Sequence, residues 1–325
     1  MAVYTEVAHD ELVSFLAPYD LGAVIAFKGI AEGVENTNYL LQTERGNYIL
    51  TLYEKRVREL DLPFFLGLMN HLAARGLPCP TAVTTREGRT YGYLCGKPAA
   101  LITFLNGVSV RRPTARHCAE LGAAMARMHI AGADFDDYRE NALSVDHWRA
   151  LLAASREEAD SVRPGIHDAL ARELDYLEER WPRDLPAGVI HADMFPNNVF
   201  FLDDRLSGII DFYFACNDLY AYDAAIALNA WCFEPDGSFN VTKSRRLLEA
   251  YHAARPLRPE EIANLPILAR GAAMRFLLTR LYDWLNQIDG ALVKPHNPLE
   301  YLTRLAFHQQ VQGPQGYGID ESFAA

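Results

Sequence analysis

The 325-residue sequence predicts an α+β fold with two lobes: a small N-terminal lobe with an antiparallel sheet and a helix, and a larger, mainly helical lobe that contains a β-hairpin. Two observations predict it. Residues 21–104 carry short apolar or alternating runs separated by turn residues, which is typical of strands. After Gly107 most apolar residues recur at helical spacing. We therefore expect two domains, residues 1–105 and 106–325.

The composition limits the class of protein. Half of the residues are hydrophobic and 22% are charged, which is ordinary for a folded soluble chain. The net charge of -11 argues against a nucleic acid or an anionic membrane as the main partner. No apolar stretch approaches the ~20 residues that span a bilayer, and the N-terminus lacks a signal-peptide layout. The five cysteines never have C-x-x-C spacing. We expect a cytoplasmic protein without membrane or nucleic-acid partners, either a monomer or a homodimer.

In the first lobe one long helix is expected between strands along the chain. That helix is expected at 58–75, with Pro63 near its start and Gly76 after its end. A short helix is expected before the sheet, at 5–17, and a turn at 45–47. The expected strands are 24–27, 38–42, 48–53, 81–85, 90–94 and 99–105.

In the second lobe helices surround the hairpin. We expect them at 113–130, 145–159, 166–180, 219–231, 241–254, 259–288 (with Pro266 as a candidate break) and 298–308.

The most informative segment lies in that hairpin. His191 to Asn198 reads H-x-D-x-x-x-x-N, and an apolar strand (206–210) then leads to Asp211. Strands expected at 188–190 and 199–202 flank the motif, so it is more than a chance H-x-D. This combination resembles the catalytic loop and metal-binding strand of protein-kinase-like phosphotransferases.

Phosphoryl transfer from ATP explains the spacing. One carboxylate must hold the acceptor hydroxyl, and oxygen ligands must hold Mg²⁺ against the phosphates. Asp193 fits the first task, and Asn198 and Asp211 fit the second. His191 is a further catalytic-loop residue, for which bracing the loop is favoured over chemistry.

A polar loop between the first two strands is the candidate phosphate-binding loop. Glycine, asparagine and threonine there can turn backbone N–H groups toward phosphate oxygens, although an ordinary Gly/Asn hairpin is the alternative. Neither G-x-G-x-x-G nor G-x-x-x-x-G-K-[ST] occurs in the chain. The adenine is expected against the backbone of Phe104 and Leu105 at the lobe boundary. The candidate loop residues are Gly29, Gly33, Asn36, Thr37 and Asn38.

One expected basic residue is missing. The third strand of protein-kinase-like folds usually carries a lysine that pairs with the nucleotide phosphates, and Thr51 stands near that place. Lys28, Lys55 and Arg56 are candidates to replace it, and the sequence does not choose among them.

Strings along nearly the whole chain resemble the aminoglycoside-phosphotransferase and choline-kinase family, and within it the bacterial homoserine kinases of that fold. The resemblance implies ATP and Mg²⁺ as cofactors, L-homoserine as the acceptor in a step toward threonine, and Thr51 as a trait of this branch. The strings that carry it are 35–39, 48–54, 62–65, 191–199, 211–216, 229–232, 270–284 and 298–301.

Homoserine would need its carboxylate and its ammonium group recognised. Arg275, in an apolar stretch, is the candidate for the carboxylate, with a structural ion pair to Asp223 or Asp283 as an equal alternative. The candidates for the ammonium group are Asp218, Asp223 and Asn38, supported by the aromatic rings of Tyr213 and Trp231.

Two alternative functions remain open. The first keeps the fold and changes the acceptor to choline, ethanolamine, an aminoglycoside or methylthioribose. The second is a non-catalytic, nucleotide-binding pseudokinase, which the missing lysine favours and the intact Asp193, Asn198 and Asp211 oppose.

Overall fold

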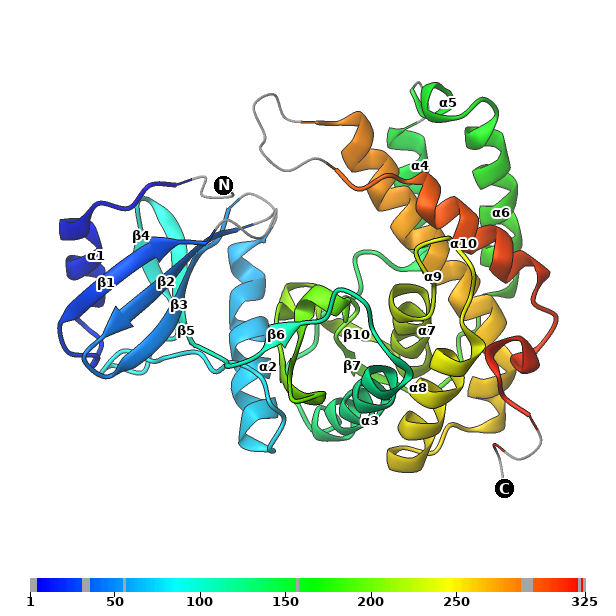
Figure 1. Ribbon diagram of the computed structural model, residues 1–325. Helices are drawn as coiled ribbons and strands as arrows, with labels where there is room; N and C mark the ends of the chain where they lie inside the picture. Colours follow the sequence, from blue (N-terminus) through cyan, green and yellow to red (C-terminus); the bar gives the residue numbers. More distant parts are fainter. Residues whose placement is uncertain are drawn as a thin grey trace. The chain divides into compact units, whose positions relative to one another are not determined.

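The computed structural model describes residues 5–30, 36–54, 57–155, 158–287, 295–320 and 323 (Figure 1). The chain forms two compact units. The first comprises Met1–Gly107 with two later segments, Phe135–Asp137 and Ser207–Tyr213. The second comprises Val108–Asp134, Tyr138–Leu206 and Phe214–Ala325. The sequence analysis did not anticipate that the first unit takes up later segments.

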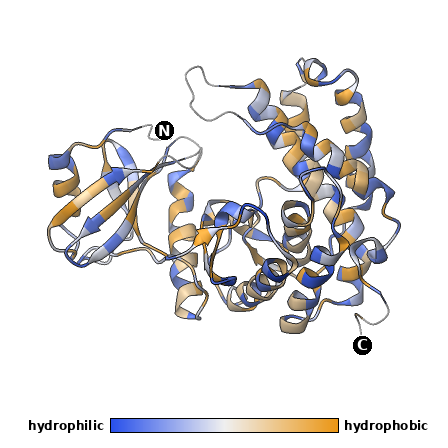
Figure 2. Cartoon of the chain, viewed as in Figure 1, coloured by the Kyte–Doolittle hydropathy of each residue, from blue (hydrophilic) through white to orange (hydrophobic). Residues whose placement is uncertain are grey.

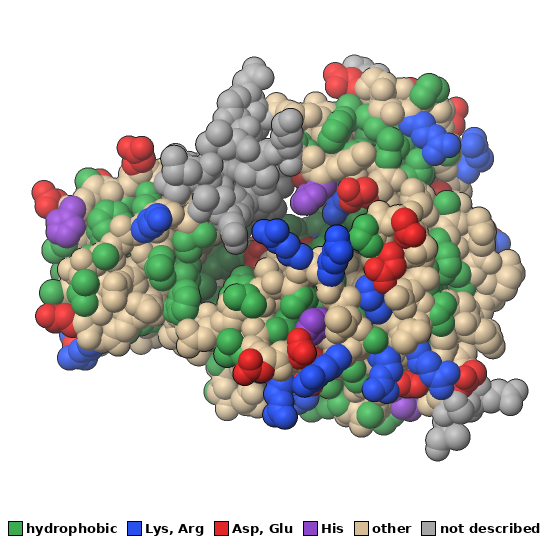
Figure 3. Space-filling model, viewed as in Figure 1, with side chains coloured by type: hydrophobic (Ala, Val, Ile, Leu, Met, Phe, Trp, Pro, Cys, Tyr) green, Lys and Arg blue, Asp and Glu red, His purple; other side chains and the backbone are tan. Residues whose placement is uncertain are grey.

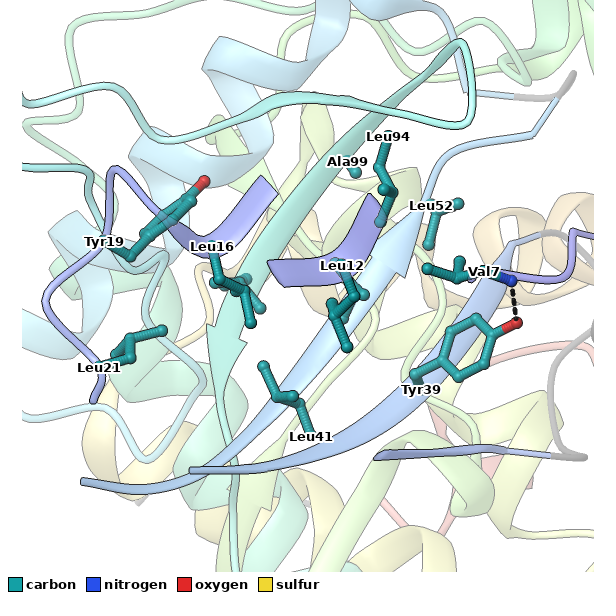
Figure 4. Close-up of a cluster of buried hydrophobic side chains, with 12 residues drawn as sticks. Val7, Leu12, Leu16, Tyr19, Leu21, Tyr39, Leu41, Leu52, Leu94 and Ala99 are labelled. Carbon is teal, nitrogen blue, oxygen red and sulfur yellow. Dashed lines mark hydrogen bonds between the residues drawn. The ribbon is translucent and has the colours of Figure 1, made fainter. Parts of the chain in front are cut away.

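The first unit is built on an antiparallel sheet of order β1-β2-β3-β5-β4. Alternation places Tyr39, Leu41, Leu50 and Leu52 on one face, where α1 (His9–Leu16) covers them (Figure 4). The Val7 N–H donates to the Tyr39 hydroxyl at 3.2 Å, which ties the segment before α1 to the same face. The strands are β1 (Val24–Gly29), β2 (Thr37–Thr43), β3 (Gly46–Leu52), β4 (Gly92–Leu94) and β5 (Lys97–Thr103).

Two expectations for this unit need correction. Thr43 pairs with Gly46, so the hairpin turn is Glu44-Arg45 rather than 45–47. Residues 81–85 form only one isolated bridge, Ala82 to Ile102, and not a strand. The Thr85 N–H already donates to the Arg89 carbonyl in the following turn, so the pairing cannot extend.

The helix of the first unit forms where it was expected. A 3-10 turn (Glu59–Asp61) leads into α2 (Leu62–Ala74), and the chain turns away at Gly76, whose φ is +82°. Most of α2 is hydrophobic, as Figure 2 shows, and seven of its side chains are buried.

The second unit is mainly helical. Its helices are α3 (Ala115–Ala131), α4 (Val145–Ala154), α5 (Ala159–Val162), α6 (Ile166–Arg180), α7 (Tyr220–Trp231), α8 (Val241–Ala254), α9 (Pro259–Leu285) and α10 (Leu299–Gln310). Both α6 and α8 have the predicted bounds, whereas α4 ends five residues before the predicted 159. Helix α9 is not broken at Pro266: it continues for 27 residues and packs against α4, α7 and α10.

Short strands carry the hairpin motif. β7 (Ala187–Ile190) pairs antiparallel with β10 (Cys216–Leu219), and β6 (Val108–Ser109) pairs with β8 (Val199–Leu202). A turn at Asp203 and Asp204, with φ of +48° and +59°, leads into β9 (Arg205–Ile209). The sheet order is β6-β8-β9. The chain passes from the second unit to the first within β9.

The surface carries charges of both signs. Around α3 and α8 the face in Figure 3 shows Lys and Arg side chains interleaved with acidic ones, despite the net charge of -11. Within the part of the chain that the structure describes, no helix has the length and apolar character needed to cross a membrane.

Candidate active site

The predicted catalytic loop runs from the end of β7 to the start of β8, within the second unit. The Asn198 amide nitrogen donates to the Asp193 carboxylate at 3.0 Å and to the Asp193 carbonyl at 2.9 Å. The Asp193 N–H donates to His191 Nδ1 at 3.2 Å. His191 is fully buried, and Asp193 is partly exposed. The structure thus brings three predicted residues into one hydrogen-bonded loop.

The loop has an unusual backbone at Ala192, whose φ is +62°. Because a non-glycine residue in this region is strained, its neighbours must hold it. The Asp223 carboxylate, on α7, accepts from the N–H groups of His191 (3.1 Å) and Ala192 (2.8 Å). Arg275, on α9, donates from Nη1 to the Ala192 carbonyl at 2.6 Å. Two buried side chains therefore fix the peptide that precedes Asp193.

Asp223 is charged in this setting. Burial works to raise its pKa, but hydrogen bonds and charges from His129 and from the loop hold the pKa below its usual value. His129 Nε2 lies 3.0 Å from the Asp223 carboxylate, and His129 Nδ1 lies 2.7 Å from the Tyr251 hydroxyl. Burial lowers the pKa of His129, and the hydrogen bond and charge of Asp223 oppose this shift.

Two of the predicted substrate ligands, Asp223 and Trp231, are buried and bonded to the catalytic loop. Asp223 has none of its surface exposed and is bonded to the loop backbone. Trp231 is also buried, and its indole N–H donates to the Met194 carbonyl at 2.6 Å. These contacts favour a bracing role for both residues over a place in an acceptor pocket, because neither polar group faces open space. These bonds join residues more than 30 positions apart, so no local pattern in the sequence indicates them.

Arg275 and Asp218 also lie in the second unit. Arg275 is 2% exposed, and its Nε has no hydrogen-bond partner. Arg275 donates to the Ala192 carbonyl, whereas the Asp223 carboxylate is bonded to His129. Asp218, on β10, accepts from Asn141 Nδ2 at 2.6 Å and from the Leu219 N–H at 2.7 Å. Burial raises the pKa of Asp218.

Asp211 and Tyr213 follow β9 in the chain and belong to the first unit. Asp211 also has a positive φ, +64°. The Tyr213 hydroxyl lies 3.0 Å from the Tyr53 hydroxyl, and its ring lies edge-on to Phe65 with centroids 5.7 Å apart. Burial raises the pKa of Tyr213 to about 12, so it stays neutral. Tyr213 is thus packed between the sheet and α2.

The register of the sheet separates its polar residues by face. Asn38 pairs with Thr51, and the Thr51 hydroxyl donates to the Asn38 side chain at 2.8 Å. This pair lies on the face opposite α1, because Tyr39, Leu50 and Leu52, on the α1 face, alternate with it. The missing lysine would belong on the face of Thr51.

The same register shows on which face of the sheet a basic candidate lies. Lys28 pairs with Leu40, two residues from Asn38, so Lys28 shares the face of Thr51. Lys97, on β5, forms an ion pair with Glu54. Lys55 and Arg56 lie outside the described residues, as does Gly33.

The described ends of the candidate phosphate loop are tied to the sheet. Gly29 pairs with Tyr39 at the end of β1. Asn36 accepts from the Glu54 N–H at 3.3 Å, and the Thr37 hydroxyl donates to the Glu54 carboxylate at 2.8 Å. These side chains therefore tie residues 36 and 37 to the sheet.

Phe104 and Leu105 follow β5 directly, the first exposed and the second partly buried. Among the residues that the structure describes, no three carboxylate, imidazole or thiol side chains cluster in a way that could hold a metal ion. The predicted metal ligands are one amide and one carboxylate, Asn198 in the second unit and Asp211 in the first.

Comparison with known proteins places the chain in a family. Residues 26–257 match the model of a family described as the phosphotransferase enzyme family, and the chain belongs to this family. It is 62% identical to a homoserine kinase of Parvibaculum lavamentivorans, over 98% of this chain and 100% of that relative. It is 64% identical to a homoserine kinase of Xanthobacter autotrophicus, over 98% of this chain and 99% of the relative.

Solved structures share the fold. An amicoumacin kinase in complex with AMP-PNP and Ca²⁺ has a TM-score of 0.70 and 15% identity, over 94% of both chains. A spectinomycin phosphotransferase in complex with ADP has a TM-score of 0.65 and 14% identity, over 97% of this chain and 98% of the other. The predicted family and the protein-kinase-like fold are thereby confirmed.

Proposed function

We propose that the protein transfers the γ-phosphoryl group of ATP to the side-chain hydroxyl of L-homoserine. The observation that carries this proposal is identity above 60% to homoserine kinases over 98% of the chain. The hydrogen-bonded loop of His191, Asp193 and Asn198 supports it, since it holds a partly exposed carboxylate in a rigid setting.

Asp193 is assigned to the acceptor hydroxyl. Its carboxylate orients the hydroxyl and accepts the proton late, because positioning and charge neutralisation dominate a loose phosphoryl-transfer transition state. Asp223, Arg275 and Trp231 act through the loop: they hold the backbone from which Asp193 projects. These three are positioning residues.

Asn198 and Asp211 are assigned to Mg²⁺. Asn198 Nδ2 is bonded to Asp193, so the atom that would face a metal ion is Oδ1, which also accepts from Asn197 Nδ2 at 3.1 Å. Bound Mg²⁺ would neutralise charge on the phosphates. The pairing of an amide oxygen with a carboxylate suits a hard cation that keeps several waters.

The first unit is assigned to the nucleotide and the second to the acceptor. Backbone groups at Gly29, Asn36, Thr37 and Asn38 would approach the phosphates, and those of Phe104 and Leu105 the adenine. On the Thr51 face of the sheet, Lys28 is the described cation that would replace the missing lysine. For the acceptor ammonium, Asp218 remains the candidate. Burial raises its pKa, and an ion pair with the ammonium group would stabilise the ionised carboxylate.

Replacing the two reacting-site acids tests the assignment. We expect Asp193→Asn and Asp211→Asn each to lower kcat for homoserine-dependent ADP release by roughly 10²–10⁴-fold, because each removes a charge needed in the transition state. Asp203→Asn is the matched control: Asp203 is exposed and, like Asp211, has a positive φ that asparagine tolerates. Near wild-type turnover by a folded Asp193→Asn or Asp211→Asn enzyme would refute the corresponding role.

A further inference from the structure

A row of polar side chains continues from the catalytic loop into the helices of the second unit. The Asp223 carboxylate, on α7, accepts from the loop backbone and lies 3.0 Å from His129 Nε2, on α3. His129 Nδ1 lies 2.7 Å from the Tyr251 hydroxyl, on α8. Arg255 Nη1, at the end of α8, donates to the Tyr251 hydroxyl at 3.1 Å and to Glu261, on α9, at 3.0 Å. Side chains from α3, α7, α8 and α9 are thus linked to the catalytic loop.

The row is buried from Asp223 to Tyr251, with His129 between them. The ring of Tyr220 lies against the His129 imidazole, with centroids 4.7 Å apart, and the guanidinium carbon of Arg255 lies 4.5 Å from the Tyr220 ring centroid. Polar groups buried in this way are almost always hydrogen-bonded. We therefore expect each N–H and O–H of the row to have an acceptor within it.

The two ends of the row determine where its hydrogens lie. The guanidinium group of Arg255 has only donors, so the Tyr251 oxygen accepts from it and the Tyr251 hydrogen is left for His129 Nδ1. Burial raises the pKa of Tyr251, so it keeps this hydrogen. At the other end, backbone N–H groups donate to both oxygens of Asp223, and an ionised carboxylate only accepts. The hydrogen between Asp223 and His129 therefore belongs on Nε2, and a second one on Nδ1 would displace that of Tyr251 from its acceptor.

We propose that Tyr251 is a positioning residue for phosphoryl transfer. It donates to His129 Nδ1 and holds the imidazole in the form that carries its hydrogen on Nε2. This form donates to Asp223, which holds the strained peptide at Ala192, directly before Asp193. The inference rests on the proposed function and extends it to a residue that acts through two others. Because a small displacement of a reacting group lowers the rate of the chemical step, the role should appear in kcat.

A second buried histidine–tyrosine pair provides a matched control. His308, also in the second unit, has Nδ1 2.9 Å from the Tyr317 hydroxyl and Nε2 3.1 Å from Asn229 Oδ1. Its Nε2 thus faces a neutral amide rather than the carboxylate that holds the loop. Tyr251→Phe and Tyr317→Phe each remove a hydroxyl from Nδ1 of a buried histidine, so a purely structural role predicts the same result for both.

We expect Tyr251→Phe to lower kcat for homoserine-dependent ADP release about tenfold and to change KM for ATP and for homoserine less than about twofold. Tyr317→Phe should change kcat less than about twofold. Both should lower Tm by roughly 2–4 °C, since each loses a buried hydrogen bond, and kinetics are measured well below either Tm. Equal kcat for the two variants, or a loss that appears in KM instead, would overturn the inference.

Nitrogen NMR of the wild-type enzyme with isotope-labelled histidines gives a readout that does not depend on the acceptor. At neutral pH we expect His129 Nε2 to carry a hydrogen and Nδ1 to carry none, with the signals assigned by their loss in His129→Gln. A hydrogen on His129 Nδ1 would overturn the inference whatever the effect of Tyr251→Phe on kcat. Absence of homoserine phosphorylation by the wild-type enzyme would instead overturn the proposed function, and the protonated nitrogen would still decide the link between Tyr251 and the loop.

Discussion

Ala192 is the residue on which the shape of the catalytic loop depends. A non-glycine residue with φ of +62° costs of order 1–3 kcal/mol, and the cost is tolerated only where the surroundings fix the conformation. Asp223 and Arg275 do so from opposite sides of one residue, through its N–H and its carbonyl. The strain and the two braces together place the Asp193 carboxylate.

His308 gives the second unit a measurable pH dependence. It is buried, with Nδ1 2.9 Å from the Tyr317 hydroxyl and Nε2 3.1 Å from Asn229 Oδ1. Burial lowers its pKa from 6.5 to about 3. Between these pH values the unfolded chain binds a proton that the folded protein does not. Stability from this group is therefore complete above pH 6.5 and is lost as the pH falls toward 3.

We expect His308→Gln to remove this dependence. At neutral pH the substitution lowers the free energy of unfolding. As the pH falls below 6.5, the difference between wild type and variant should decrease by up to about 1.4 kcal/mol for each pH unit. Urea unfolding at pH 7.5 and pH 5 measures it. Tyr317→Phe, which leaves His308 in place, should keep the wild-type pH dependence. Parallel curves for wild type and His308→Gln would contradict the assignment.

At the residue scale, the sequence predicted contacts between residues that are close in the chain. It did not predict contacts between residues far apart in the chain. Asp193, Asn198 and His191 lie within eight positions, so a motif revealed their association before the structure showed their bonds. The braces on the same loop come from α7 and α9, and no local pattern marks them. Asp223 and Trp231 were expected at the substrate because burial cannot be read from one acid or one indole.

At the scale of elements, helices α3 and α8 approach closely at Gly122. A Cβ added there would overlap the backbone carbonyl of Leu247, so no side chain fits without moving a helix. Gly67, in α2, has room: its added Cβ would lie 3.7 Å from Phe135, an ordinary contact. The two glycines thus make a matched pair in helix interiors.

We expect Gly122→Ala to lower the free energy of unfolding by about 1–3 kcal/mol or more, through overpacking against α8. Gly67→Ala should leave it unchanged or raise it by roughly 0.5–1 kcal/mol, since alanine favours the helix. Chemical denaturation of both variants provides the comparison. Equal stability of Gly122→Ala and wild type would show that the helices do not need this close approach.

Helices with a long amphipathic pattern were predicted correctly. Short strands that depend on pairing with a partner strand were not. Helices α6 and α8 have the predicted bounds because their amphipathic patterns span four turns. Strand β6, of two residues, and β10, of four, exist only through their partners β8 and β7, so sequence alone could not reveal them. Residues 81–85, in contrast, have a strand-like composition but form only one isolated bridge.

At the scale of the whole molecule, the chain forms two compact units, and the residues proposed for the reaction are divided between them. Asp193 and Asn198 belong to the second unit, and Asp211 belongs to the first although it follows them in the chain. The predicted two-lobed fold is confirmed by solved kinases of the same fold at TM-scores of 0.70 and 0.65. The acceptor is not a property of this fold, since these neighbours carry the names of different substrates.

The most direct test is therefore a comparison of acceptors with the purified wild-type enzyme. ADP release from ATP and Mg²⁺ would be measured with L-homoserine, choline, kanamycin and methylthioribose, and the phosphorylated product identified by mass spectrometry. The proposed function predicts kcat/KM for homoserine at least roughly tenfold above the others, about 1.4 kcal/mol in the transition state, with O-phosphohomoserine equal to the ADP formed. Preference for another alcohol, or ADP release without phosphohomoserine, would contradict it.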